Sequence, residues 1–148
     1  MAPTRPPSLR VRLLLDAGPE ASPMSPPLAR VLVVDDEPQV AAVLRDALND
    51  LGYAVQVAVN GAEALGLVSL YRPDVVLLDL GMPDMPGDVV LERLHLVEPH
   101  LPVIVVTGNA DADRARATLD RGAFDYVSKP FDLEILARIL AAAVIYRG

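Results

Sequence analysis

The chain has 148 residues, of which 52% are hydrophobic, with four Tyr, two Phe and no Trp, which suits one domain with an aliphatic core. The formal net charge of -7 argues against a nucleic-acid-binding surface. The absence of cysteine excludes disulfides, zinc-thiolate sites and thiol catalysis. No apolar run approaches the roughly 20 residues that span a membrane, and no signal-peptide pattern is found. These features predict a cytoplasmic protein that binds neither nucleic acid nor membrane.

The first part of the chain has a different composition from the rest. Residues 1–27 carry seven of the 14 prolines, a density that does not suit packed structure. We therefore expect a disordered extension over residues 1–28 and one domain over residues 29–148. Met24 lies just before the expected domain and is an alternative to Met1 as the start of the protein.

After residue 28, apolar runs alternate with helical patterns. Five β–α units of this kind predict an open parallel sheet with helices on both faces. Asp132 is the expected N-cap of the last helix. The pattern predicts strands over 29–34, 53–59, 75–79, 103–106 and 123–127, and helices over 38–51, 62–70, 89–97, 112–121 and 133–146.

The central stretch, residues 75–83, reads VVLLDLGMP. Four apolar residues followed by turn formers indicate a strand that is buried on both faces and that ends at Asp79. An isolated aspartate in this position often caps a turn. Three other strands also end in polar residues, however, and the carboxyl ends of parallel strands meet at one edge, where such sheets bind ligands. The residues predicted at this edge are Asp35, Asp36, Asp79, Thr107 and Lys129.

The residue types at this edge indicate a particular chemistry. Three neighbouring carboxylates repel one another unless a cation lies among them, and ligands that are all oxygen favour a hard ion such as Mg²⁺. The hydroxyl of Thr107 and the ammonium of Lys129 suit an anion that arrives with the metal. Lys129 is the one lysine among 13 basic residues, which reflects either compositional drift or the need for a compact point charge. Together these groups imply phosphoryl transfer onto Asp79.

Four motifs carry a family resemblance. They are VVDDEP at 33–38, LDLGMP at 78–83, VVTG at 105–108 and YVSKP at 126–130. With these motifs in this order, residues 29–146 resemble the receiver domain of bacterial two-component response regulators. The resemblance implies an α/β fold of the flavodoxin-like (βα)5 type, a doubly wound parallel sheet with strand order 2-1-3-4-5.

The resemblance also implies the role of the acidic residues. Asp79 would accept a phosphoryl group from a histidine kinase or a phosphotransfer protein. Asp36, Asp79 and the backbone carbonyl of Gly81 would bind Mg²⁺, with Asp35 assisting, in part through water. The protein would be a signalling switch and not an enzyme with an external substrate.

The remaining motif residues would bind the phosphoryl group and transmit its presence. The resemblance implies that Thr107, Gly108 and Lys129 contact the phosphoryl oxygens, and that the Lys129–Pro130 peptide bond is cis. Tyr126 would turn inward as Thr107 moves. The response would be a remodelled face, within residues 108–145, that binds a target protein or a second copy of the chain.

Three alternatives remain at this point. The chain could be the receiver fragment of a longer regulator whose output domain lies beyond Gly148. A haloacid-dehalogenase-like phosphatase also uses an Asp nucleophile, Mg²⁺ and a lysine. That family, however, has a second Asp two residues after the nucleophile, whereas in this chain the residue two positions after Asp79 is Gly81. A flavodoxin-like nucleotide-binding module would have a glycine-rich phosphate loop after a strand, and none occurs.

Overall fold

The structure, a computed structural model, describes residues 26–108 and 111–147. The disordered extension predicted over 1–28 therefore lies mostly outside the described residues. Near the start of the described residues, the backbone N–H of Leu28 donates to the Gly52 carbonyl oxygen at 2.9 Å.

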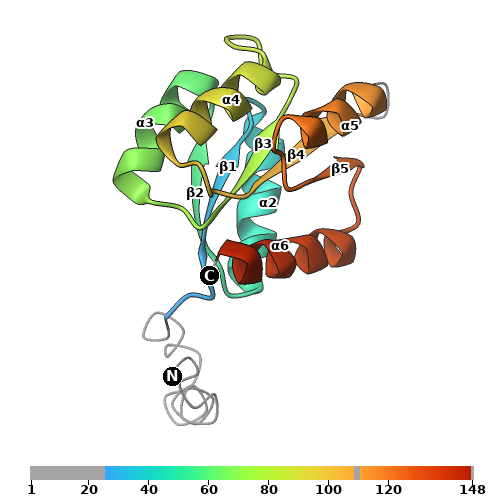
Figure 1. The fold of residues 1–148 in the computed structure, drawn as a ribbon. Helices are drawn as coiled ribbons and strands as arrows, with labels where there is room; N and C mark the ends of the chain where they lie inside the picture. Colours follow the sequence, from blue (N-terminus) through green and yellow to red (C-terminus); the bar gives the residue numbers. More distant parts are fainter. Residues whose placement is uncertain (1–25, 109–110, 148) are drawn as a thin grey trace, which may run out of the picture.

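Within residues 26–108 and 111–147, five parallel strands form one sheet in the order β2-β1-β3-β4-β5, which confirms the predicted topology (Figure 1). Apolar residues fill the strands, and every residue of β3 is buried, as expected for a central strand covered on both faces. The strands are β1 (Arg30–Val34), β2 (Ala54–Ala58), β3 (Val75–Asp79), β4 (Val103–Gly108) and β5 (Asp125–Lys129).

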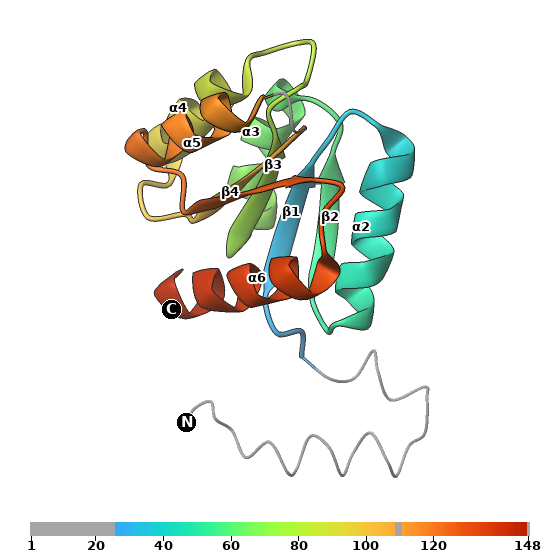
Figure 2. The ribbon, with the colours of Figure 1, turned by 90° about the vertical axis from the view of Figure 1, so that its right-hand side faces the viewer.

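In the part of the chain that the structure describes, five helices cover the two faces of the sheet. Helices α2 and α6 pack on one face, and α3, α4 and α5 pack on the other (Figure 2). Neighbouring strand residues alternate between the two apolar clusters, so that Leu77 faces α2 and α6 while Leu78 faces the other layer. Among the described residues, no helix has the length and apolar character needed to cross a membrane. The helices are α2 (Pro38–Asp50), α3 (Gly61–Tyr71), α4 (Gly87–Val97), α5 (Ala112–Asp120) and α6 (Leu133–Arg147).

The last strand begins two residues later than the sequence pattern predicts. The N–H of Ala123 donates to the Thr118 carbonyl oxygen at 3.0 Å, so this apolar residue closes helix α5 before β5 starts. At the other end β5 extends to Lys129, and β4 extends through Thr107 to Gly108. Asp79, Thr107 and Lys129 therefore lie within the last two residues of their strands, where the sheet fixes their backbone, and Asp35 and Asp36 directly follow β1.

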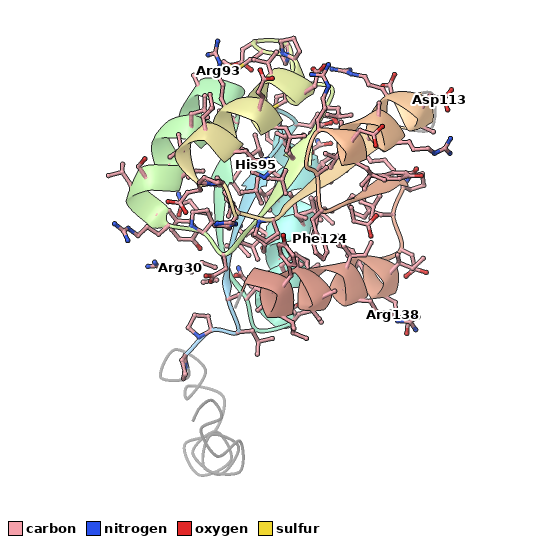
Figure 3. All side chains as sticks on the ribbon, in the orientation of Figure 1. Arg30, Arg93, His95, Asp113, Phe124 and Arg138 are labelled. Atoms are coloured by element: carbon pink, nitrogen blue, oxygen red, sulfur yellow. The ribbon has the colours of Figure 1, made fainter. Side chains whose placement is uncertain are left out.

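Local contacts explain where individual elements start and end. The predicted N-cap of α6 is confirmed, because the Glu134 N–H donates to Asp132 Oδ1 at 2.8 Å. At the amino-terminal edge of the sheet, His95 Nε2 lies 2.9 Å from the Leu101 carbonyl oxygen. Phe124 packs against Tyr146 there with ring centroids 5.4 Å apart. Figure 3 shows His95 and Phe124 between the helices, whereas Arg93, Asp113 and Arg138 extend outward.

Gly87, the first residue of α4, is a point of close approach that leads to a stability prediction. A Cβ atom at Gly87 would lie 2.7 Å from Leu80 Cα and closer still to Leu80 Cδ2. We expect Gly87→Ala to lower the free energy of unfolding by about 1–3 kcal/mol, since the backbone of Leu80 cannot move aside easily. Urea denaturation measures this change.

Gly66 is the matched control for this substitution. It is an exposed residue inside α3, and apart from its chain neighbours and the backbone of its own helix no atom lies within 4 Å of the position its Cβ would take. Gly66→Ala should raise the free energy of unfolding by about 0.5–1 kcal/mol, because alanine loses less backbone entropy in a helix. Equal effects of the two substitutions would contradict the steric argument.

Candidate functional site

The register of the sheet brings the predicted site residues to one edge. Asp79 is paired with Val106, and Gly108 is paired with Lys129. Asp35 directly follows β1, and β1 pairs with β3 on the side opposite to β4. The first, third, fourth and fifth strands therefore all end at the same level, as the sequence predicts.

Asp35, Asp36 and Asp79 form a compact group that we call the acidic cluster. One carboxylate oxygen from each lies within 4.8 Å of the other two. Asp35 and Asp79 are only 2% and 7% exposed, and Asp36 is half-buried. Backbone donors hold two of these side chains, because Asp35 Oδ1 accepts from the Glu37 N–H at 2.9 Å and Asp79 Oδ1 accepts from the Gly81 N–H at 3.0 Å.

Lys129 supplies the positive charge next to the acidic cluster. Its Nζ lies 3.4 Å from Asp35 Oδ2, and it lies at the same distance from Asp79 Oδ2. A third carboxylate contact, to Glu37 Oε1 at 3.4 Å, was not predicted. The sequence feature that points to a site role for Glu37 is its place directly after two aspartates at a strand end. The sequence alone does not show whether its side chain turns toward Lys129 or toward solvent.

The electrostatics of the site follow from burial and from these contacts. Burial raises the pKa of Asp35, and the negative charge of Asp79 raises it further, against the opposing effects of the Glu37 N–H and Lys129. Burial acts to lower the pKa of Lys129, but the charges of Asp79 and Asp35 outweigh it and the pKa is raised. One ammonium thus faces several carboxylates, and the surplus negative charge fits a bound cation. Because every donor is oxygen, a hard ion such as Mg²⁺ suits this set.

Thr107 and Tyr126, the predicted switch pair, project from the same face of the sheet. Tyr126 is paired with Val105, and Thr107 lies two residues beyond Val105 in the same strand. Thr107 is 1% exposed, and its hydroxyl donates to the Gly108 carbonyl oxygen at 3.3 Å. Tyr126 is half-buried against the apolar cluster under α3, α4 and α5. The predicted cis peptide bond between Lys129 and Pro130 is confirmed.

Comparison with known proteins agrees with this geometry. The family model of the response regulator receiver domain matches residues 31–141. The chain belongs to this receiver family. Response regulator MprA of a Mycobacterium species is 44% identical over 113 residues, which cover 76% of this chain and 49% of that protein. Transcriptional regulatory protein KdpE of Mycobacterium tuberculosis is 49% identical over 115 residues, which cover 76% of this chain and 50% of that protein.

Solved structures show the same fold. A response regulator receiver domain protein from Clostridium thermocellum has a TM-score of 0.76 and 32% identity, over 79% of this chain and 94% of that one. A CheY-like receiver domain protein from Methanospirillum hungatei has a TM-score of 0.76 and 29% identity, over 81% and 96% of the two chains. The receiver domain therefore spans nearly the whole of these structures, and about half the length of the curated relatives it matches.

Charge repulsion in the acidic cluster leads to a stability prediction for this receiver domain. In metal-free buffer, Asp79→Asn should raise the melting temperature by about 2–8 °C, the shift expected for ~1 kcal/mol of relieved repulsion. The asparagine oxygen can still accept the Gly81 N–H, and Lys129 keeps its contact with Asp35. Thermal melting followed by circular dichroism measures the shift.

The control is Glu92→Gln, which removes the same charge from an exposed position on α4. We expect this variant to have the same melting temperature as the wild type, since a surface charge away from the site contributes little to stability. A melting temperature of Asp79→Asn at or below that of the wild type would contradict the argument from repulsion.

Proposed function

We propose that this receiver domain is a phosphorylation-dependent switch in which Asp79 accepts a phosphoryl group from a phosphohistidine. The donor would be a histidine kinase or a phosphotransfer protein. The observation that carries the proposal is the buried Asp79 carboxylate, which lies within the acidic cluster and 3.4 Å from the ammonium of Lys129. A nucleophile, a cation site and an anion-binding ammonium are thus next to one another.

The acidic cluster and the turn at Gly81 would hold Mg²⁺. When bound, the ion neutralises charge on the transferring phosphoryl group. Asp36 and Asp79 would be direct ligands together with the Gly81 carbonyl, and Asp35 would act partly through water. This division is supported by burial, because Asp35 is the more enclosed of the first two aspartates and already accepts the Glu37 N–H.

The transfer itself is a displacement at phosphorus. An oxygen of Asp79 attacks, a P–O bond forms, and the P–N bond to the donor imidazole breaks with its electron pair left on that nitrogen. Lys129 would exchange its carboxylate contacts for the oxygens of the phosphoryl group. Thr107 and Gly108 lie at the end of the neighbouring strand β4, and they would contact the phosphoryl oxygens through the Thr107 hydroxyl and the Gly108 backbone.

The signal would leave through the face formed by α5, β5 and α6. Helix α5 is weakly docked, because its inward-facing buried residues are Ala115 and Thr118, and Leu119 is 38% exposed. Two ion pairs add to this contact: Arg114 Nη2 and Arg121 Nη1 lie 3.6 Å and 3.9 Å from the carboxylate oxygens of Asp88 on α4. Ion pairs of this exposure contribute about 0–1 kcal/mol, so α5 can move at low cost.

Next to α5, the surface offers apolar contacts for a partner. A groove of about 490 Å³ runs between β5 and the start of α6, with Tyr126 and Ile135 among its lining residues. Leu133 and Ile135 of α6 are 43% and 50% exposed, as expected for a helix with more apolar residues than one inward stripe needs. A target protein or a second copy of the chain would bind here when Thr107 and Tyr126 shift.

A second form of the proposal concerns an attached output domain. The relative KdpE is named a transcriptional regulatory protein, and the matched region is half of its length. The same switch would then control a transcription-directed domain joined to the receiver domain. The phosphoryl chemistry at Asp79 is common to both forms.

Phosphoryl uptake tests the proposal directly. Incubation with acetyl phosphate and Mg²⁺ should place one acid-stable, base-labile phosphate on each chain, and none on Asp79→Asn. Radiolabel retention or intact mass measures the product. Continuous release of phosphate without a stable adduct would favour a phosphatase instead.

Lys129 provides a sharper variant in the same assay. Lys129→Arg keeps the charge, but the longer planar guanidinium cannot occupy the place of a point-charge ammonium, so phosphoryl uptake should fall well below wild type. Arg138→Lys, an exposed change on α6, is the matched control and should have no effect. Full uptake by Lys129→Arg would contradict the role given to the ammonium.

Hydrogen exchange tests where the signal leaves. Addition of beryllofluoride and Mg²⁺, which imitates the phosphoryl group, should change amide protection in residues 108–140 as well as around Asp79. Asp79→Asn treated in the same way should show no change. Protection changes that stay around Asp79 would place the output face elsewhere.

A further inference from the structure

Asp84 ties the loop between β3 and α4 to a distant helix. This loop, residues 80–86, crosses the edge of the sheet at which α3 begins (Figure 1). The Asp84 carboxylate accepts the Gly61 N–H at 3.1 Å and the Ala62 N–H at 3.4 Å. Both donors belong to the first turn of α3, more than 20 residues earlier in the chain.

The hydrogen bonds at the start of α3 show why a second side-chain acceptor, besides the N-cap residue, is needed there. The first N–H groups of a helix have no partner within it. The N-cap residue Asn60 accepts only the Glu63 N–H, at 2.8 Å, through its side chain. Asp84 accepts the two N–H groups that Asn60 does not reach, and its negative charge at a helix N-terminus is favourable.

The same loop carries Gly81, whose carbonyl is a proposed ligand of the cation. At its start, the loop is held by the hydrogen bond from Gly81 N–H to Asp79 Oδ1. At its end, Gly87 lies against Leu80. In the middle, Asp84 is hydrogen-bonded to α3. The next residue, Met85, packs closely on Gly61, because a Cβ atom at Gly61 would lie 3.3 Å from Met85 Cβ.

We propose that Asp84 is a positioning residue for cation binding. By fixing the middle of the loop to α3, it holds the Gly81 carbonyl in place for the acidic cluster, and it couples the start of α3 to the occupancy of the site. The inference rests on the proposed function, since it assumes that the acidic cluster binds Mg²⁺. Outer contacts of this kind typically change metal affinity by about 10–100-fold when removed.

A purely structural role for Asp84 as a cap of α3 makes a different prediction. Asn60→Ala removes the other cap of the same helix and does not touch the loop. Both Asn60→Ala and Asp84→Ala should lower the melting temperature by a similar few degrees, about the loss of one helix cap. Only Asp84→Ala should loosen the loop that carries Gly81.

The experiment compares Mg²⁺ affinity by titration calorimetry in the full chain and in three variants. We expect Asp84→Ala to weaken binding about tenfold, and Asn60→Ala to stay within about twofold of the wild type. Asp84→Asn loses the charge but keeps an oxygen acceptor, so its affinity should lie between those of Asp84→Ala and the wild type. In Asp84→Ala, hydrogen exchange should also become faster at the amides of residues 80–86.

Three other results would each contradict the positioning role of Asp84 or the proposed function. Equal Mg²⁺ affinities of Asp84→Ala and Asn60→Ala would show that Asp84 only caps α3 and does not position the loop for cation binding. Equal affinities of Asp84→Asn and Asp84→Ala would show that only the charge matters, and the positioning role would be wrong. A wild-type chain that binds no Mg²⁺ would overturn the proposed function together with this inference, whereas the first two results leave the proposed function intact.

Discussion

The arrangement on which the site depends is a group of carboxylates held together at one edge of the sheet beside one ammonium. Asp35 and Asp79 are nearly fully buried, and Lys129 is shared between them and Glu37. Such a group is unfavourable by itself, because burial and like-charge repulsion both oppose ionised carboxylates. It persists because the strands that carry it are fixed by apolar packing on both faces. The fold therefore holds a site with surplus negative charge, which a bound cation would balance.

The two edges of the sheet differ in how firmly they are closed. At the amino-terminal edge, His95 is hydrogen-bonded to the Leu101 carbonyl oxygen, and Phe124 packs on Tyr146, so α4, α6 and the loops between them are held by direct contacts. At the carboxyl-terminal edge, polar side chains and loops replace this packing. The carboxyl-terminal edge is therefore the one where backbone and side chains can rearrange without opening the core.

Much of this arrangement could be predicted because it follows from local patterns. Apolar runs that end in polar residues gave the strands, and parallel alignment then required Asp35, Asp79 and Lys129 to meet. The side-chain bonds of Glu37 and Asp84 could not be predicted, since their partners lie 92 and 23 residues away and depend on how the loops turn. The start of β5 was misplaced because apolar residues 123–124 read as strand, while the backbone of Ala123 closes α5.

The ten residues from Asp79 to Asp88 connect the site to three other elements through three aspartates. Asp79 contacts Lys129 of β5, and Asp84 is bonded to the start of α3. Asp88 pairs with Arg114 of α5 and with Arg121, the residue directly after this helix. The route from Asp79 to Asp88 is short in space, because Gly87 packs directly on Leu80, the residue after Asp79. A close-packed contact of this kind transmits a displacement instead of absorbing it. A shift of the Asp79 carboxylate would therefore reach the Asp88 ion pairs through Leu80 and Gly87, and α5, with little buried apolar surface of its own, would be the helix that responds.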